Sequence, residues 1–120
     1  MPNLAAALGK SPMALAGREV DQALQDEVSM LLAPLGAPEW IDEAQFDLAT
    51  ALVGSGPAFV YRFIDALAAG GAALGFTPEQ AERLALAMVE GAAELARQSA
   101  HSPAELARMV ASPGGTTEAG

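Results

Sequence analysis

The sequence predicts an all-α fold, with one helical domain over residues 1–120 and a central buried helix. Three observations support this. Apolar residues recur at helical spacing in several segments, and helix-start signatures stand before three of them. Apolar residues make up 52% of the chain but aromatic residues only 5%, with 12 glycines. Small side chains let helix backbones approach closely, and the apolar surplus predicts a surface buried in an oligomer.

The first third of the chain predicts one helix after an irregular start. Residues 1–17 carry Pro, Asn and Gly at irregular spacing, which predicts a loop or extended connector. From residue 18 an apolar face has helical period, and Pro34 and Gly36 end it. That face comprises Val20, Leu24, Val28, Leu31 and Leu32.

A second helix is predicted from Glu43 to about Leu52. Trp40 and Ile41 before it suit a short extended piece. Asp42 is a good N-cap, and Gln45 stands at the position that completes a capping box.

The central helix is predicted from Pro57 to about Leu74. Glycines at 54 and 56 break the preceding helix, and proline suits the first turn of a new one. The helix is apolar almost all round, which predicts burial on most sides. Arg62 and Asp65, with the many Ala and Gly residues, argue against a membrane span.

Two further helices are predicted, each beginning with a capping box and a proline. Thr77, Pro78 and Gln80 form a capping box with proline at the first position, after Gly75 in a C-terminal position. This helix is expected to reach about Ser99. Its predicted buried stripe is Leu84, Met88, Gly91, Ala92 and Leu95. The last helix starts at Ser102-Pro103, with Glu105 completing the box, and ends near Val110.

Charge and composition disfavour several functions. The net charge is −9 with only six Lys and Arg, so nucleic acid and anionic membrane surfaces are not expected partners. There is no cysteine, and His101 is the single histidine, so no metal site is expected. The start lacks the basic and apolar regions of a signal peptide, which makes a cytoplasmic protein the expectation.

Two glycine turns go beyond a plain helical domain. In the first, Gly54-Ser55-Gly56 lets backbone approach a ligand, while Thr50 projects a hydroxyl from the preceding turn. The second, Ser112 to Thr117, places two glycines before a helix start, where converging N–H groups suit a carboxylate or phosphate. Each segment also suits a simpler role: the first as a break between two helices, and the second as a capped turn.

These segments resemble the pyrroline-5-carboxylate reductase family. The resemblance rests on "MPN" at the start, "DLATALVGSGPAFVYRFIDALAAGGAALGFTPEQA" in the middle and "VASPGGTTEAG" at the end. It implies a helical half that interlocks in a homodimer or a larger oligomer. It also implies reduction of 1-pyrroline-5-carboxylate to L-proline with NADPH or NADH.

The resemblance also implies roles for individual residues. The substrate carboxylate would be bound at Ser112, Gly115 and Thr116, and Thr117 would orient the ring nitrogen. An alcohol is poorly suited to act as a general acid near neutral pH, so Thr117 is expected to orient rather than to protonate. The residues expected beside the cofactor are Pro2, Asn3, Thr50 and Val110. Those expected to wall the pocket are Gly54, Ser55 and Gly56.

Some positions depart from the family pattern. Val53 and Ala111 stand where the family usually has hydroxyl residues, and Ser102 stands where histidine often precedes the proline. His101 is expected at the surface. No Rossmann fingerprint precedes "MPN", so residues 1–17 are interpreted as a connector from a missing cofactor domain. Residues 112–120 are interpreted as the substrate loop and the start of a truncated helix.

Two alternatives stay open. One is a non-catalytic helical oligomerisation module that kept the packing of the family but lacks a cofactor domain. The other is the helical half of a different dehydrogenase, against which the SPGGTT segment argues.

Overall fold

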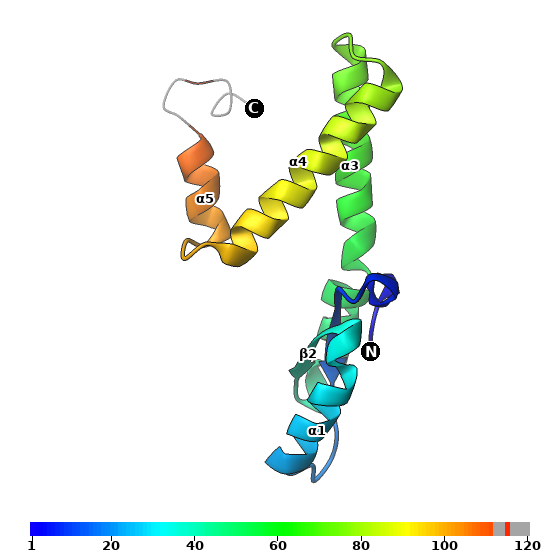
Figure 1. The fold of residues 1–120 in the computed structure, drawn as a ribbon, viewed down its shortest axis with the longest axis vertical. Coiled ribbons are helices and arrows are strands. Elements are labelled where there is room, and N and C mark those ends of the chain that lie inside the picture. Colours follow the sequence, from blue (N-terminus) through cyan, green and yellow to red (C-terminus); the bar gives the residue numbers. More distant parts are fainter. Residues whose placement is uncertain (112–114, 116–120) are drawn as a thin grey trace. The chain divides into compact units, whose positions relative to one another are not determined.

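The structure, a computed structural model, describes residues 1–111 and 115 (Figure 1). The chain divides into two compact units, Met1–Arg62 and Phe63–Gly120, and each is described by itself. That the two units form one domain stays a prediction. The principal elements are β1 (Ser11–Leu15), α1 (Gln22–Leu32), β2 (Gly36–Trp40), α2 (Phe46–Ala49), α3 (Gly56–Ala73), α4 (Pro78–Gln98) and α5 (Pro103–Val110). Short turns lie between them: 3-10 turns at Leu4–Leu8, Ala33–Leu35 and Glu43–Gln45, and a π-helical turn at Thr50–Gly54.

The first unit contains a parallel strand pair joined by a helix. β1 pairs with β2 in register from Ser11 opposite Gly36 to Leu15 opposite Trp40, and α1 forms the crossover that parallel strands require (Figure 1). The sequence predicted extended or loop structure for residues 1–17 and a short extended piece at Trp40, but not this pairing. The described chain is therefore mostly helical with one small sheet.

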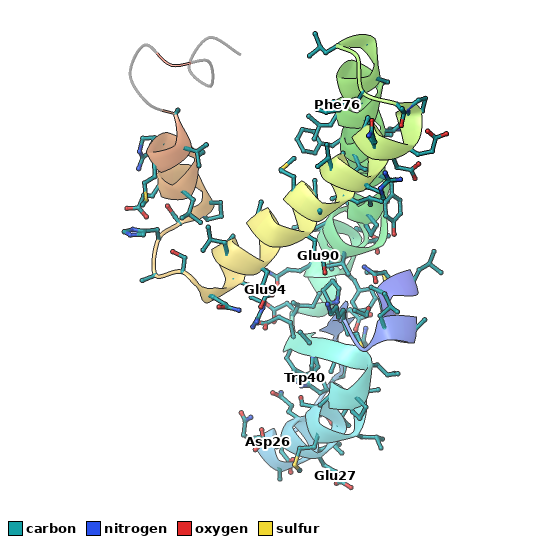
Figure 2. All side chains as sticks on the ribbon, turned by 45° about the horizontal axis from the view of Figure 1, so that its top comes forward. Asp26, Glu27, Trp40, Phe76, Glu90 and Glu94 are labelled. Atoms are coloured by element: carbon teal, nitrogen blue, oxygen red, sulfur yellow. The ribbon has the colours of Figure 1, made fainter. Side chains whose placement is uncertain are left out.

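The close approach of the strands depends on Gly36. Its φ is +144°, and a Cβ built on it would lie 2.0 Å from the carbonyl oxygen of Ser11. Only glycine fits there, because that distance is far inside van der Waals contact. The interior of this unit is small. Met13 and Ala14 are buried. Trp40, labelled in Figure 2, donates its indole N–H to the Ser29 hydroxyl at 3.0 Å.

The capping motifs predicted from the sequence form at the starts of the helices. Capping boxes form at Asp42 with Gln45, at Thr77 with Gln80, and at Ser102 with Glu105. Asp21 caps α1 through a bond from the Leu24 N–H, 2.9 Å long. These local signals fix where the helices begin. The starts predicted at Glu43, Pro78 and Pro103 are confirmed, whereas α1 begins at Gln22, four residues after the predicted residue 18.

In the second unit, the turn between α3 and α4 brings the two helices into contact. Gly75 has a φ of +118°, and the Phe76 N–H donates to the Gly71 carbonyl at 3.2 Å. Phe76 lies in this turn (Figure 2). A Cβ built on Gly71 would lie 3.3 Å from the Cβ of Ala81, so small residues set the spacing here.

The predicted burial of the helices is not found within a single chain. The buried residues of α4 are Ala81 and Ala85, whereas Leu84 and Leu95 of the predicted stripe are 55% and 60% exposed. The prediction of that stripe was wrong for the isolated chain. No residue of α3 is buried either, although the helix is present as predicted.

One further expectation about the helices concerns the membrane. Within the described residues, no helix combines the length and hydropathy that a bilayer-spanning segment needs.

Candidate functional site

The turn between α2 and α3 has an unusual backbone. Residues Thr50–Gly54 form a π-helical turn, in which the Ser55 N–H donates to the Thr50 carbonyl at 3.0 Å. Single π turns inside helices are rare and occur frequently at functional sites. The predicted pocket wall, Gly54 to Gly56, begins at the last residue of this turn and ends at the first residue of α3.

Thr50 begins the π turn, but its hydroxyl is already engaged. The oxygen lies 2.9 Å from the Phe46 carbonyl, one helical turn back, and 3.3 Å from the sulfur of Met1. A hydroxyl has one hydrogen, and the carbonyl is the stronger acceptor. Thr50 therefore has only its oxygen lone pairs left for a ligand.

Asn3 reaches the same turn from the start of the chain. Its side-chain amide donates to the Val53 carbonyl at 3.0 Å, and its side-chain oxygen accepts from the Ala5 N–H at 2.9 Å. The backbone N–H of Asn3 donates to the hydroxyl of Ser11, which is fully buried. The structure thus brings Asn3 to the predicted pocket wall, which lies about fifty residues further along the sequence.

An open hollow of about 750 Å³ lies beside this contact. Asn3, Gly54, Gly56 and Pro57 contribute to its lining. Most of the remaining lining is apolar: Leu4, Ala5, Pro12, Leu52, Val53, Phe59, Val60 and Tyr61. A mostly apolar hollow with a few polar backbone groups is the usual character of a small-molecule site.

The two glycines of the turn leave backbone accessible. No atom lies within 4 Å of a Cβ built on Gly56, and the nearest to one on Gly54 is a Thr50 methyl at 3.8 Å. The packing of the chain itself therefore does not require glycine at either position. Their lack of side chains leaves room for something outside the chain.

The structure describes only some of the other predicted site residues. Pro2 is exposed beside Asn3, and Ser55 is exposed in the turn. Val110 ends α5 in the second unit and is 68% exposed, and Gly115 is half-buried. Ser112, Thr116 and Thr117 lie outside the described residues, so the carboxylate cradle stays a prediction.

Charged groups in the described part do not gather into a site. No group of His, Asp and Glu there is arranged to hold a metal ion. A hydrogen bond to Glu94 raises the pKa of Arg97, and hydrogen bonds from the Ser102 backbone and hydroxyl lower the pKa of Glu105. Neither residue is part of the lining of the hollow, and both lie at exposed helix ends. His101 is exposed just before α5, as predicted.

A known family matches the last third of the first unit together with the whole second unit. The family model described as pyrroline-5-carboxylate reductase dimerisation matches residues 43–120. That range includes the π turn, α3, α4, α5 and the segment from Ser112 to Thr117.

Curated relatives match nearly the whole chain. Pyrroline-5-carboxylate reductase from Aquifex aeolicus is 46% identical over 118 residues, which cover 98% of this chain and 44% of that protein. The Pseudomonas aeruginosa reductase is 43% identical over 121 residues, with 99% and 44% covered. The chain therefore spans a little under half the length of the curated relatives it matches.

Solved structures have the same fold. A reductase from Coxiella burnetii superposes with a TM-score of 0.94 at 34% identity, covering 99% of this chain and 45% of that one. The Plasmodium falciparum reductase with NADP bound gives a TM-score of 0.86 at 30% identity, covering 99% and 48%. The extent of the family match, together with these relatives, shows that the chain belongs to the pyrroline-5-carboxylate reductase dimerisation family.

Proposed function

We propose that this chain is the substrate-binding and dimerisation half of a pyrroline-5-carboxylate reductase. The observation that carries this proposal is the family match over residues 43–120, because it contains both glycine turns. The reaction would reduce 1-pyrroline-5-carboxylate to L-proline with NADPH or NADH, in the cytoplasm.

The chain would hold the substrate by its carboxylate. Ser112, Gly115 and Thr116 would bind the carboxylate, since backbone N–H groups at a helix start suit an anion. Thr117 would hydrogen-bond the ring nitrogen and orient the C=N bond. Orientation of two reactants in one site accounts for a large part of such a rate enhancement.

The described residues fit the ring end of a nicotinamide cofactor. The hollow beside Asn3 is mostly apolar, and Gly54 and Gly56 present backbone without side chains there. Pro2, Asn3, Thr50 and Val110 would lie beside this ring, and the Gly54–Gly56 turn would wall the pocket. When bound, the cofactor would supply the hydride for reduction of the C=N bond. A domain outside this sequence would hold the rest of it.

The chain would act as a homodimer or a larger assembly of such dimers. Large apolar side chains on α3 are exposed in the single chain, including Phe59 at 68% and Phe63 at 55%. Exposed apolar surface of this kind is typical of an association surface. Interlocking of two copies through α3 would provide the burial that the sequence predicted for this helix.

The sharpest test places this chain in a complete relative. The chain would replace the matching segment of the Aquifex aeolicus reductase, to which it is 46% identical. We expect the chimera to oxidise NADPH or NADH when 1-pyrroline-5-carboxylate is added. The double variant Thr117→Ala with Gly115→Val should lose this activity. His101→Ala should retain it, because His101 is exposed and is not part of the lining of the hollow.

The same experiment separates the alternative of a non-catalytic oligomerisation module. The exposed apolar surface of α3 favours association whether or not the chain takes part in catalysis. A chimera that binds NADP and forms dimers but reduces no substrate would support the module and contradict the proposal. Activity that survives the Thr117 and Gly115 changes would contradict the site assignment alone.

A further inference from the structure

The backbone carbonyl of Val53, just before α3, has neither of its usual helical partners. In an α-helix the Val53 carbonyl would accept from the N–H of residue 57, but Pro57 has none. The next N–H, that of Ala58, donates to the Ser55 carbonyl at 3.0 Å. Neither the α-helical nor the π-helical donor is therefore available to Val53.

The side chain of Asn3 fills this gap. Its amide nitrogen lies 3.0 Å from the Val53 carbonyl oxygen, across a separation of fifty residues. The orientation of the amide is unambiguous, because the Ala5 N–H can only donate to one end and the Val53 carbonyl can only accept from the other. Ser11, fully buried, anchors the backbone of Asn3 at 2.9 Å.

This contact does not use the side chain of Val53. Asn3 binds the backbone oxygen, so the replacement of the serine usual in the family by valine leaves the contact intact. The contact connects the segment at the start of the chain to the residue directly before Gly54. A shift of Val53 would therefore move the predicted pocket wall.

We propose that Asn3 is a positioning residue, which holds the Gly54–Gly56 turn in place through the Val53 carbonyl that Pro57 leaves unpaired. The inference rests on the proposed function for its consequence in catalysis. The hydrogen bond itself does not depend on that function. Asn3 thus acts on the pocket wall through its amide, a role separate from the place beside the cofactor ring that the proposed function gives it.

The first test uses amide hydrogen exchange on the chain and does not require activity. Asn3→Ser keeps an oxygen that can cap the first turn but removes the amide donor. The Ser55 N–H donates within the π turn. We expect its hydrogen exchange to accelerate by about fivefold to tenfold, which corresponds to the loss of the stabilisation from one hydrogen bond. An unchanged rate would overturn the proposal.

A second variant turns this into a rescue experiment. Pro57→Ala restores a backbone N–H at the position that an α-helix would use for Val53. In that background Asn3→Ser should change the Ser55 exchange rate by less than about twofold, because the carbonyl then has another donor. Equal effects of Asn3→Ser in both backgrounds would show that Asn3 does not act through this carbonyl.

The same pair of substitutions in the chimera tests the catalytic consequence. Asn3→Ser should lower kcat/KM by about tenfold, since small misplacement of a wall is costly. Adding Pro57→Ala should restore kcat/KM to within about threefold of Pro57→Ala alone. No restoration would mean that the effect of Asn3 on catalysis does not pass through the Val53 carbonyl, and would overturn the proposal. If the unsubstituted chimera is inactive, the proposed function fails and the exchange experiment alone decides the role of Asn3.

Discussion

Gly71 of α3 lies directly against Ala81 of α4, so that a Cβ on Gly71 would approach the Ala81 Cβ to 3.3 Å. Ala81 is buried, and little space is available for a larger residue. Gly71→Leu should therefore destabilise the chain by about 1–3 kcal/mol relative to Gly70→Leu. Gly70 is a matched control, because nothing lies within 4 Å of a Cβ there and the gain in helix propensity is the same. Urea unfolding followed by circular dichroism measures the difference. Equal stabilities would show that this contact does not set the helix spacing.

The strand pair offers a second prediction, at Gly36. A side chain there would meet the Ser11 backbone at 2.0 Å and would also have to adopt a φ of +144°. Gly36→Ala should cost on the order of 3 kcal/mol or more and separate β1 from β2. Gly75→Ala provides the comparison, since its φ is +118° but the space around it is open. It should cost only about 1–2 kcal/mol, and thermal unfolding of both variants would measure the contrast.

Trp40 and Ser29 give a prediction that can be read optically. Trp40 is the single tryptophan, so its fluorescence reports on the first unit. Ser29→Ala removes the acceptor of the half-buried indole N–H and should destabilise this unit by about 1 kcal/mol. Ser29→Thr keeps a hydroxyl and should recover part of that loss. A denaturation midpoint that is the same for Ser29→Ala and the unsubstituted chain would contradict the role of this bond.

Glu105 predicts a pH dependence at the start of α5. The backbone N–H of Ser102, and then its hydroxyl, donate to the carboxylate at 2.7 and 2.8 Å and hold the pKa of Glu105 below its ordinary value. A lowered pKa in the folded state means that the contribution to stability is present above the ordinary value. That contribution is lost as pH falls through the lowered one.

Carbon-13 chemical shifts of the Glu105 carboxyl would follow this titration. The midpoint should lie below that of the same group in the urea-unfolded chain. Ser102→Ala should raise the midpoint partway, because it removes the hydroxyl donor but keeps the backbone donor. A midpoint that does not respond to Ser102→Ala would leave the hydroxyl without an electrostatic role.

Local features of the fold could be predicted from the sequence. Capping boxes such as Thr77 with Gln80 depend on residues three positions apart, so the sequence displays them directly. The pairing of β1 with β2 depends on residues twenty-five positions apart and on the glycine that lets them approach. No local pattern encodes that pairing, and it was missed.

In the candidate site, too, the local feature was predictable and the long-range contact was not. The glycine turn at Gly54 to Gly56 was visible as composition, but the need of the Val53 carbonyl for a donor was not predicted. That Asn3 supplies the donor follows only from the folded backbone. The predicted stripe at Leu84 and Leu95 was wrong for the single chain because a hydrophobic pattern does not distinguish burial within a chain from burial between chains.

The exposed apolar side chains of α3 have a consequence for the abundance of the protein in the cell. Among the described residues, the buried apolar side chains are Met13, Ala14, Ala81 and Ala85, a small set for a chain of this length. A newly synthesised copy displays phenylalanines such as Phe59, as an incompletely folded chain does, and chaperones and proteases act on such surfaces. We therefore expect copies made at low concentration to be degraded before they meet, so that cellular abundance rises more steeply than the rate of synthesis.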